Sequence, residues 1–162
     1  MDKIVKNIYL LRHEQRTDDP GFDTCLTEQG LLNSKCILDR LNKIDFVPTK
    51  IYVSPYIRCL QTAQDMCDRL DIKLMIENSL AEWFNPKDAV NRVTTPRKLS
   101  SKEIDKYNVD PYYMSFLNQD RFQEYESWNA CINRTKEFLN FLDKKHGHNS
   151  DGSIIESPWF RC

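Results

Sequence analysis

The sequence has 162 residues, of which 40% are hydrophobic and 29% charged, and its formal net charge is −1. This length suits one domain with a substantial core, and the composition is typical of a folded globular protein. A net charge near zero predicts no general attraction to nucleic acid or to a membrane surface, so an anion site would need a local group of basic side chains. No apolar run reaches bilayer-spanning length and the six cysteines form no Cys-x-x-Cys pair, so we expect a cytoplasmic protein with reduced thiols.

Short apolar segments predict the strands. Residues 3–11 are rich in Ile, Val, Tyr and Leu and predict a buried strand, followed by short strands over 50–53 and 72–76. Residues 154–155 are the only strand seed near the end of the chain. Strands that alternate with helices indicate an α/β fold with a mainly parallel sheet.

Helical patterns lie between these strands. Thr27 is typical of a helix N-cap and predicts a helix over 27–41, and a second helix is predicted over 60–70. Their apolar faces comprise Leu31, Leu38 and Leu41 in the first, and Leu60, Ala63, Cys67 and Leu70 in the second. Further along, Ser100 and Glu103 form a possible capping box, and residues 128–145 predict a longer amphipathic helix.

Basic side chains follow two of the predicted strands. Arg12 and His13 come directly after the first strand, and Arg58 follows the second strand at the start of a helix. Ligands of open α/β sheets bind at the carboxyl ends of the strands, so these three side chains would meet at one edge if the two strands were neighbours. Arginine forks and helix-start N–H groups would bind a phosphate dianion, and nearby cations would favour a neutral, nucleophilic imidazole.

Glu82 is a candidate proton donor. It lies after the third predicted strand and is followed by Trp83 and Phe84. Apolar neighbours can keep a carboxyl group partly protonated, as a general acid requires. The alternative is a surface glutamate beside two core aromatic residues.

Four blocks of the sequence, in this order, resemble the histidine phosphatases, the phosphoglycerate-mutase-like superfamily. They are Leu-Arg-His at 11–13, Leu26-Thr27 with Gly30, Ser54-Pro55-x-x-Arg58-Cys59-x-Gln61-Thr62-Ala63, and Leu80-x-Glu82-Trp83. The resemblance covers roughly residues 4–84, and Glu126-Ser127 with Arg134 in the later helix also fits the family's pattern.

Within the superfamily, one branch is the most similar. Arg16 and Asp18, together with the segment 77–83, resemble the suppressor-of-T-cell-receptor-signalling and insect ecdysteroid-phosphate phosphatases. The resemblance implies that Arg16 is a third phosphate-contacting arginine. The alternative is a loop arginine paired with Asp18 or Asp19.

The resemblance implies two-step chemistry without a metal or another cofactor. Phosphate would bind to Arg12, Arg58 and Arg16, and His13 would attack it to form a phosphohistidine. Glu82 would protonate the leaving oxygen and then deprotonate the hydrolytic water. The chain's three histidines form no cluster with metal-ligand spacing, so we expect no metal site.

Two features depart from the family's pattern. Glu14 stands where the family has glycine directly after the nucleophilic histidine, and its carboxylate could repel phosphate or pair with a clamp arginine. The family also has a second histidine at the end of a later strand, where this chain has residues 156–158, Glu-Ser-Pro. His146 and His148 come at the end of the long helix instead, where the expected role is a cation that complements the helix dipole or part of a solvated tail.

We therefore expect a three-layer α/β/α sandwich that is incomplete at its C-terminal end. Residues 1–149 would form the histidine-phosphatase-like domain, with 85–127 as a substrate-side insertion, and 150–162 would be a divergent tail.

The expected function is phosphomonoester hydrolysis through a phosphohistidine on His13. The substrate would be a small-molecule or aryl phosphate ester, or a phosphoprotein. Aromatic residues are candidates to line its pocket or to pack in the core: Trp83, Phe84, Tyr112 and Tyr113. The alternatives are mutase-type phosphoryl transfer and a catalytically impaired pseudophosphatase that binds phospho-ligands. The sequence does not indicate an oligomeric state.

Overall fold

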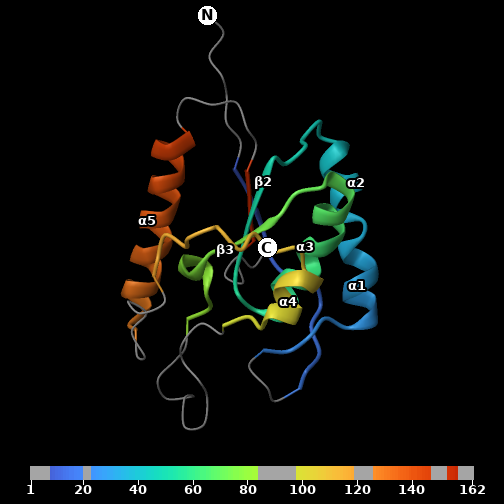
Figure 1. The fold of residues 1–162 in the computed structure, drawn as a ribbon, viewed down its shortest axis with the longest axis horizontal. Coiled ribbons are helices and arrows are strands. Elements are labelled where there is room, and N and C mark those ends of the chain that lie inside the picture. Colours follow the sequence, from blue (N-terminus) through green and yellow to red (C-terminus); the bar gives the residue numbers. More distant parts are fainter. Residues whose placement is uncertain (1–7, 20–22, 84–97, 119–125, 147–152, 157–162) are drawn as a thin grey trace, which may run out of the picture.

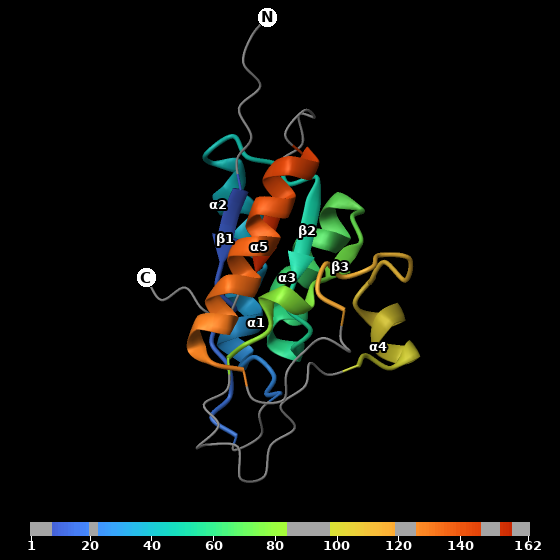
Figure 2. The same cartoon turned by 90° about the vertical axis from the view of Figure 1, so that its left-hand side faces the viewer.

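The computed structural model describes residues 8–19, 23–83, 98–118, 126–146 and 153–156. In chain order the elements are β1 (Ile8–Leu11), α1 (Glu28–Ser34), α2 (Ile37–Asn42), β2 (Lys50–Val53), α3 (Ile57–Leu70), β3 (Leu74–Ile76), the 3₁₀ helix η1 (Asn78–Leu80), α4 (Ser101–Lys106), α5 (Trp128–His146) and β4 (Ser153–Glu156). Figures 1 and 2 show their arrangement from two sides.

The strands form one parallel sheet in the order β1-β4-β2-β3. Strand β4 lies between β1 and β2, so the two strands that precede the predicted phosphate-binding residues are not direct neighbours. The last residue of β4, Glu156, is in register with Leu11 on one side and Val53 on the other. The sequence pattern predicted residues 150–162 as a divergent tail outside the domain. In the structure this range contains β4, a central strand of the sheet.

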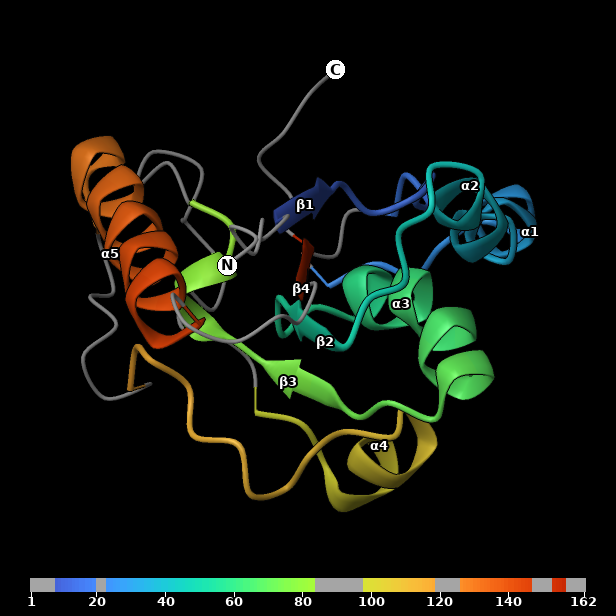
Figure 3. The same cartoon turned by 90° about the horizontal axis from the view of Figure 1, so that it is seen from above.

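Helices cover both faces of the sheet. Helices α1, α2 and α3 lie on one side of it and α5 on the other, and α4 lies beyond β3 (Figure 3). Alternate residues of β2 face the two layers: Ile51 and Val53 pack in the α3-side core, whereas Tyr52 packs with Phe138 of α5. This arrangement confirms the predicted three-layer α/β fold with a parallel sheet.

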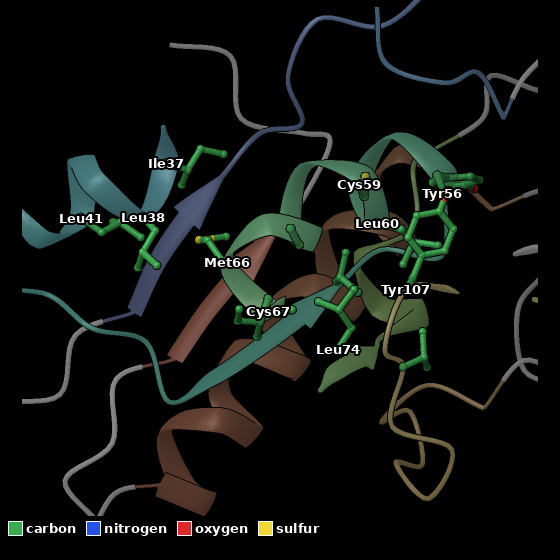
Figure 4. Close-up of a cluster of buried hydrophobic side chains, with 14 of the residues drawn as sticks. Ile37, Leu38, Leu41, Tyr56, Cys59, Leu60, Met66, Cys67, Leu74 and Tyr107 are labelled. Atoms are coloured by element: carbon green, nitrogen blue, oxygen red, sulfur yellow. The ribbon is translucent and has the colours of Figure 1, made fainter. Parts of the chain in front are cut away.

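Helix α3 is the centre of the larger core, which Figure 4 shows. Leu60, Ala63 and Cys67 are fully buried, as their helical spacing predicted, and Leu70 is half-buried. The helix ends at Asp71, which adopts a left-handed conformation with φ of 54°. Burial of this face fixes α3 against β2 and so sets where its first turn lies.

The helix predicted over 27–41 is two helices. Thr27 is its N-cap, as predicted, and its Oγ1 accepts from the backbone N–H of Gly30 at 3.0 Å. The hydroxyl of Ser34 donates to the carbonyl of Leu31, and a side-chain bond of this kind bends helices. The turn at 35–36 changes the helical phase, so Leu31 is 38% exposed and does not share the buried face of Leu38.

The predicted start of α4 and the predicted extent of α5 are both confirmed. Ser100 and Glu103 form both hydrogen bonds of a capping box at the start of α4. Helix α5 covers the range that its amphipathic pattern predicted. In the part of the chain that the structure describes, no helix combines the length and apolarity needed to cross a bilayer.

Candidate active site

His13 lies two residues beyond β1, at the carboxyl-end edge of the sheet. Its Nδ1 is 2.7 Å from the backbone carbonyl oxygen of Glu14. A carbonyl oxygen only accepts, so Nδ1 carries the ring proton. The lone pair of the neutral imidazole is therefore on Nε2, the nitrogen that remains for attack on a phosphorus atom.

The surroundings of His13 favour its neutral form. The pKa of His13 is lowered from 6.5 to about 4: burial is the largest cause, the hydrogen bond to the carbonyl of Glu14 opposes the shift, and the charges of Arg58, Arg12 and Arg16 contribute to it. The electrostatic effect of all three arginines on one imidazole supports the predicted gathering of these side chains at one edge.

Arg58 lies in the first turn of α3, and its side chain is only 1% exposed. Its Nη2 lies 2.5 Å from Oε2 of Glu82, and its guanidinium carbon lies 4.6 Å from the centre of the Tyr56 ring. The ring and the carboxylate hold the fork in a defined plane. The predicted clamp and the predicted acid are therefore paired with each other.

Helix α3 also holds the loop that carries His13. The backbone N–H of Glu14 donates to Thr62 Oγ1 at 3.1 Å, and the same hydroxyl donates to the carbonyl of Arg58 at 2.8 Å. Further along the loop, the N–H of Leu26 donates to Gln61 Oε1 at 2.7 Å. One helix thus positions both the predicted nucleophile and the predicted clamp, although β4 separates their strands.

A third contact joins the loop to the start of α3. The N–H of Ile57 donates to Asp23 Oδ1 at 2.7 Å, which satisfies one of the donors that a helix start leaves open. The loop is also packed tightly against α1, because a Cβ on Gly30 would lie 2.3 Å from the carbonyl oxygen of Gln15. Glycine at position 30 is what allows this close approach.

The other two arginines belong to the same loop and are exposed. Arg12 follows β1 directly. Arg16 Nη1 donates to Thr24 Oγ1 at 3.3 Å, whereas the hydroxyl of Thr17 donates to Asp19. Among the described contacts, Arg16 binds Thr24 and pairs with neither Asp18 nor Asp19.

The carboxylate of Glu14 points toward α1. Its Oε2 accepts from Asn33 Nδ2 at 3.2 Å. Among the described contacts, the Glu14 carboxylate pairs with none of the predicted clamp arginines. It therefore does not occupy an arginine that a phosphate would need.

Of the two aromatic residues that follow Glu82, Trp83 is the one that the structure describes. Trp83 donates from Nε1 to the carbonyl of Glu126 at 3.0 Å and packs edge-to-face on Trp128. Phe84 lies outside the described residues. The described partner of the Glu82 carboxylate is Arg58, an ion-pair partner and not an aromatic ring.

A cavity of about 480 Å³ lies beside β3 and α4, away from the residues predicted for the active site. Tyr113 lines it and donates its hydroxyl to the buried carboxylate of Glu77, while Tyr112 is 87% exposed. Tyr113 therefore lines a cavity at the β3 edge of the sheet, and Tyr112 lies on the surface.

In the described part of the chain, no second histidine lies at the carboxyl end of a strand beside His13. Strand β4 ends at Glu156 between β1 and β2, and residue 157 lies outside the described range. His146 ends α5 with no description of its side chain, and His148 also lies outside the described range. Within the described part of the chain, no group of three or more His, Cys, Asp or Glu side chains is placed to hold a metal ion.

Comparison with known proteins gives a family for the chain. The model of the Histidine phosphatase superfamily (branch 1) matches residues 8–155. The Transcription factor tau 55 kDa subunit of Saccharomyces cerevisiae is 30% identical over 95 residues, which are 51% of this chain and 22% of that protein. The Ubiquitin-associated and SH3 domain-containing protein B of Mus musculus is 27% identical over 133 residues, which are 76% of this chain and 20% of that protein. The chain thus spans about a fifth of the length of these relatives.

Solved structures share the fold. The ecdysone phosphate phosphatase of Bombix mori in complex with tungstate has a TM-score of 0.76 at 18% identity, covering 93% of this chain and 71% of that one. The protein histidine phosphatase SixA, also complexed with tungstate, has a TM-score of 0.54 at 13% identity and covers 94% of this chain and 69% of that one.

Proposed function

Because the chain belongs to the histidine phosphatase superfamily (branch 1), we propose that it hydrolyses phosphomonoesters through a phosphohistidine on His13. The observation that carries the proposal is the state of His13: a neutral imidazole with the proton on Nδ1, whose pKa is lowered by burial and by the charges of three arginines. Such a group is a nucleophile placed beside positive charge, as phosphoryl transfer requires.

In the first step, the phosphate binds to Arg58, Arg12 and Arg16, whose charges compensate those of its oxygens. Nε2 of His13 attacks the phosphorus atom, and the bond between phosphorus and the ester oxygen breaks. Glu82, which carries a proton once the phosphate has replaced it on Arg58, gives this proton to the leaving oxygen. The alcohol or phenol departs and the phosphoryl group stays on His13.

In the second step, a water molecule attacks the phosphorus atom of the phosphohistidine. The carboxylate of Glu82 takes a proton from this water, and the bond between Nε2 and phosphorus breaks. Inorganic phosphate leaves, His13 is again neutral and Glu82 is again protonated. No metal is needed for either step, because the arginines supply the positive charge.

The proposed substrate is a small-molecule or aryl phosphate ester. Support comes from the phosphatases that share the fold, one of which is described as acting on ecdysone phosphate. The exposed positions of Arg12 and Arg16 would leave room for an ester group outside the clamp.

The test is hydrolysis of an aryl phosphate by the wild type, by His13→Ala and by the matched control His146→Ala, followed by trapping of acid-labile phosphate. We expect turnover and trapped phosphate in the wild type and in His146→Ala, and neither in His13→Ala. Activity that survives His13→Ala would refute the mechanism. Vanadate binding without turnover or trapped phosphate in the wild type would identify a phospho-ligand-binding pseudophosphatase, the alternative that Glu14 favours.

A further inference from the structure

The segment that carries Glu82 is held by a buried arginine on the opposite side of the sheet. We propose that Arg134 of α5 is a positioning residue that places the Glu82 carboxyl group for proton transfer to the leaving oxygen. The inference rests on the proposed function and adds to it a residue outside the phosphate clamp.

Arg134 binds the backbone immediately before Glu82. Its side chain is 7% exposed; Nη1 donates to the carbonyl of Ser79 at 2.5 Å, and Nη2 donates to the carbonyl of Ala81 at 2.6 Å. The end of a 3₁₀ helix leaves such carbonyl groups without helical partners. The two arms of the guanidinium satisfy them and fix the turn from which the Glu82 side chain leaves the backbone.

The same guanidinium is paired with a buried carboxylate. Nε of Arg134 lies 3.0 and 2.9 Å from Oε1 and Oε2 of Glu126, and Nη2 lies 2.6 Å from Oε1. Glu126 is 8% exposed, so the charge of Arg134 is compensated inside the protein. A buried pair of this kind tolerates no loss of one partner, because the remaining charge would have no counter-ion.

Glu126 extends this contact to the residue after Glu82. Its backbone carbonyl accepts from Trp83 Nε1 at 3.0 Å, and the Trp83 ring packs on Trp128 with 5.4 Å between ring centres. Ala81, before Glu82, is thus bound by Arg134 of α5. Trp83, after Glu82, is bound by Glu126 just before that helix. Glu82 itself lies between these two ties.

This double attachment matters because Glu82 has a partly exposed side chain. The carboxyl side chain is 37% exposed, and its described side-chain contact is with Arg58, which a substrate phosphate would also bind. Once phosphate takes Arg58, the backbone on either side is what keeps Glu82 near the leaving oxygen. A displacement of about 1 Å in such a group can cost about 100-fold in rate.

Arg134 has a specific signature if it acts through Glu82. An acid matters most for a leaving group that departs poorly as an anion, and least for one that departs readily. In Arg134→Lys, which keeps the charge but loses the fork, we expect kcat/KM for an alkyl phosphate to fall about 100-fold. This parameter reports phosphoryl transfer to His13 and not the later attack of water, in which Glu82 acts as a base for every substrate. For a dinitrophenyl phosphate we expect kcat/KM to fall less than about threefold and the vanadate Kd to change less than about threefold, because the clamp is intact.

Two variants complete the design. Trp83→Phe keeps an aromatic ring but removes the donor to Glu126, so it tests the second attachment without disturbing the buried pair. Lys136→Gln, at an exposed position on the same helix, is the matched control. A general structural defect in Arg134→Lys would instead weaken vanadate binding and slow both substrates equally, and that result would overturn the inference.

A readout independent of turnover separates this inference from the proposed function. The carboxyl carbon resonance of Glu82, assigned with Glu82→Gln, should shift in Arg134→Lys and in Trp83→Phe but not in Lys136→Gln. An unchanged resonance in both would refute the positioning role even if the wild type is an active phosphatase. Absence of turnover in the wild type would refute the proposed function, and the resonance would still show whether Arg134 positions Glu82.

Discussion

The guanidinium of Arg58 and the carboxylate of Glu82 form an ion pair, with 2.5 Å between Nη2 and Oε2. The arginine is buried and the carboxylate is partly exposed, so a phosphate that reaches the site meets an arginine that already has an acceptor. We expect substrate binding to exchange the anionic partner of Arg58 Nη2 from Glu82 to a phosphate oxygen. This exchange would also release Glu82 toward the leaving oxygen.

Glu82→Gln tests the exchange. Glutamine keeps the size of the side chain but transfers no proton, so we expect kcat for an alkyl phosphate to fall about 100- to 10,000-fold. A neutral amide competes less strongly for Arg58, so vanadate should bind at least as tightly as to the wild type. The measurements are kcat and the vanadate Kd, with the exposed Glu137→Gln as control. Vanadate binding weakened more than tenfold in Glu82→Gln would show that the carboxylate assists anion binding and does not compete with it.

The lowered pKa of His13 predicts how the imidazole titrates. Burial and nearby arginines shift it from 6.5 to about 4, so the ring should stay neutral throughout the range in which an ordinary histidine becomes charged. An NMR titration of the ring, assigned with His13→Ala, should give a midpoint near 4. A midpoint near 6.5 would mean that these surroundings do not act on the imidazole as described.

The same shift has a consequence for stability. Between the folded value of about 4 and the unfolded value of 6.5, the unfolded chain binds a proton at His13 that the folded protein does not. The free energy of unfolding therefore falls as the pH decreases through this window. His13→Gln should show a smaller decrease than the wild type in denaturant titrations at the two ends of the window. Equal decreases would rule out His13 as a source of the pH dependence.

The sequence predicted the elements of the fold better than their arrangement. The N-cap Thr27, the capping box of Ser100 and Glu103 and the buried face of α3 are local patterns, and each was confirmed. The break between α1 and α2 after Ser34 was missed because the apolar residues continue at helical spacing across it. The hydrogen bond from the Ser34 hydroxyl to the backbone of Leu31 is not visible in that spacing. The insertion of β4 between β1 and β2 was missed because strand order depends on pairing between distant segments.

The candidate site was predictable as residue types and not as contacts. Arginine and histidine after strands indicated an anion site, the aromatic residues after Glu82 indicated an acid, and the resemblance supplied the role of Arg16. Gln61 and Thr62 were part of a recognised block, but nothing in a linear sequence shows that they hold the loop of His13. The pairing of Arg58 with Glu82 was missed for the same reason, since it joins two side chains far apart in sequence.

Thr62 is the clearest test of how that loop is held. Its hydroxyl accepts from the N–H of Glu14 and donates to the carbonyl of Arg58, and it is fully buried. Thr62→Val keeps the shape but leaves the N–H of Glu14 without its acceptor, which costs about 1–3 kcal/mol of folding free energy. At about 2–4 °C per kcal/mol, the Tm should fall measurably.

The same substitution should reduce catalysis, because His13, the residue next to Glu14, is the proposed nucleophile. A shift of about 1 Å in His13 would lower kcat/KM about 100-fold. Thr62→Ser retains the hydroxyl and loses only a methyl group, so it should recover most of kcat/KM even if its Tm stays low. Wild-type kcat/KM in Thr62→Val would show that the contacts of Leu26 and Asp23 with α3 are sufficient to hold the loop, and that this hydroxyl contributes only to stability.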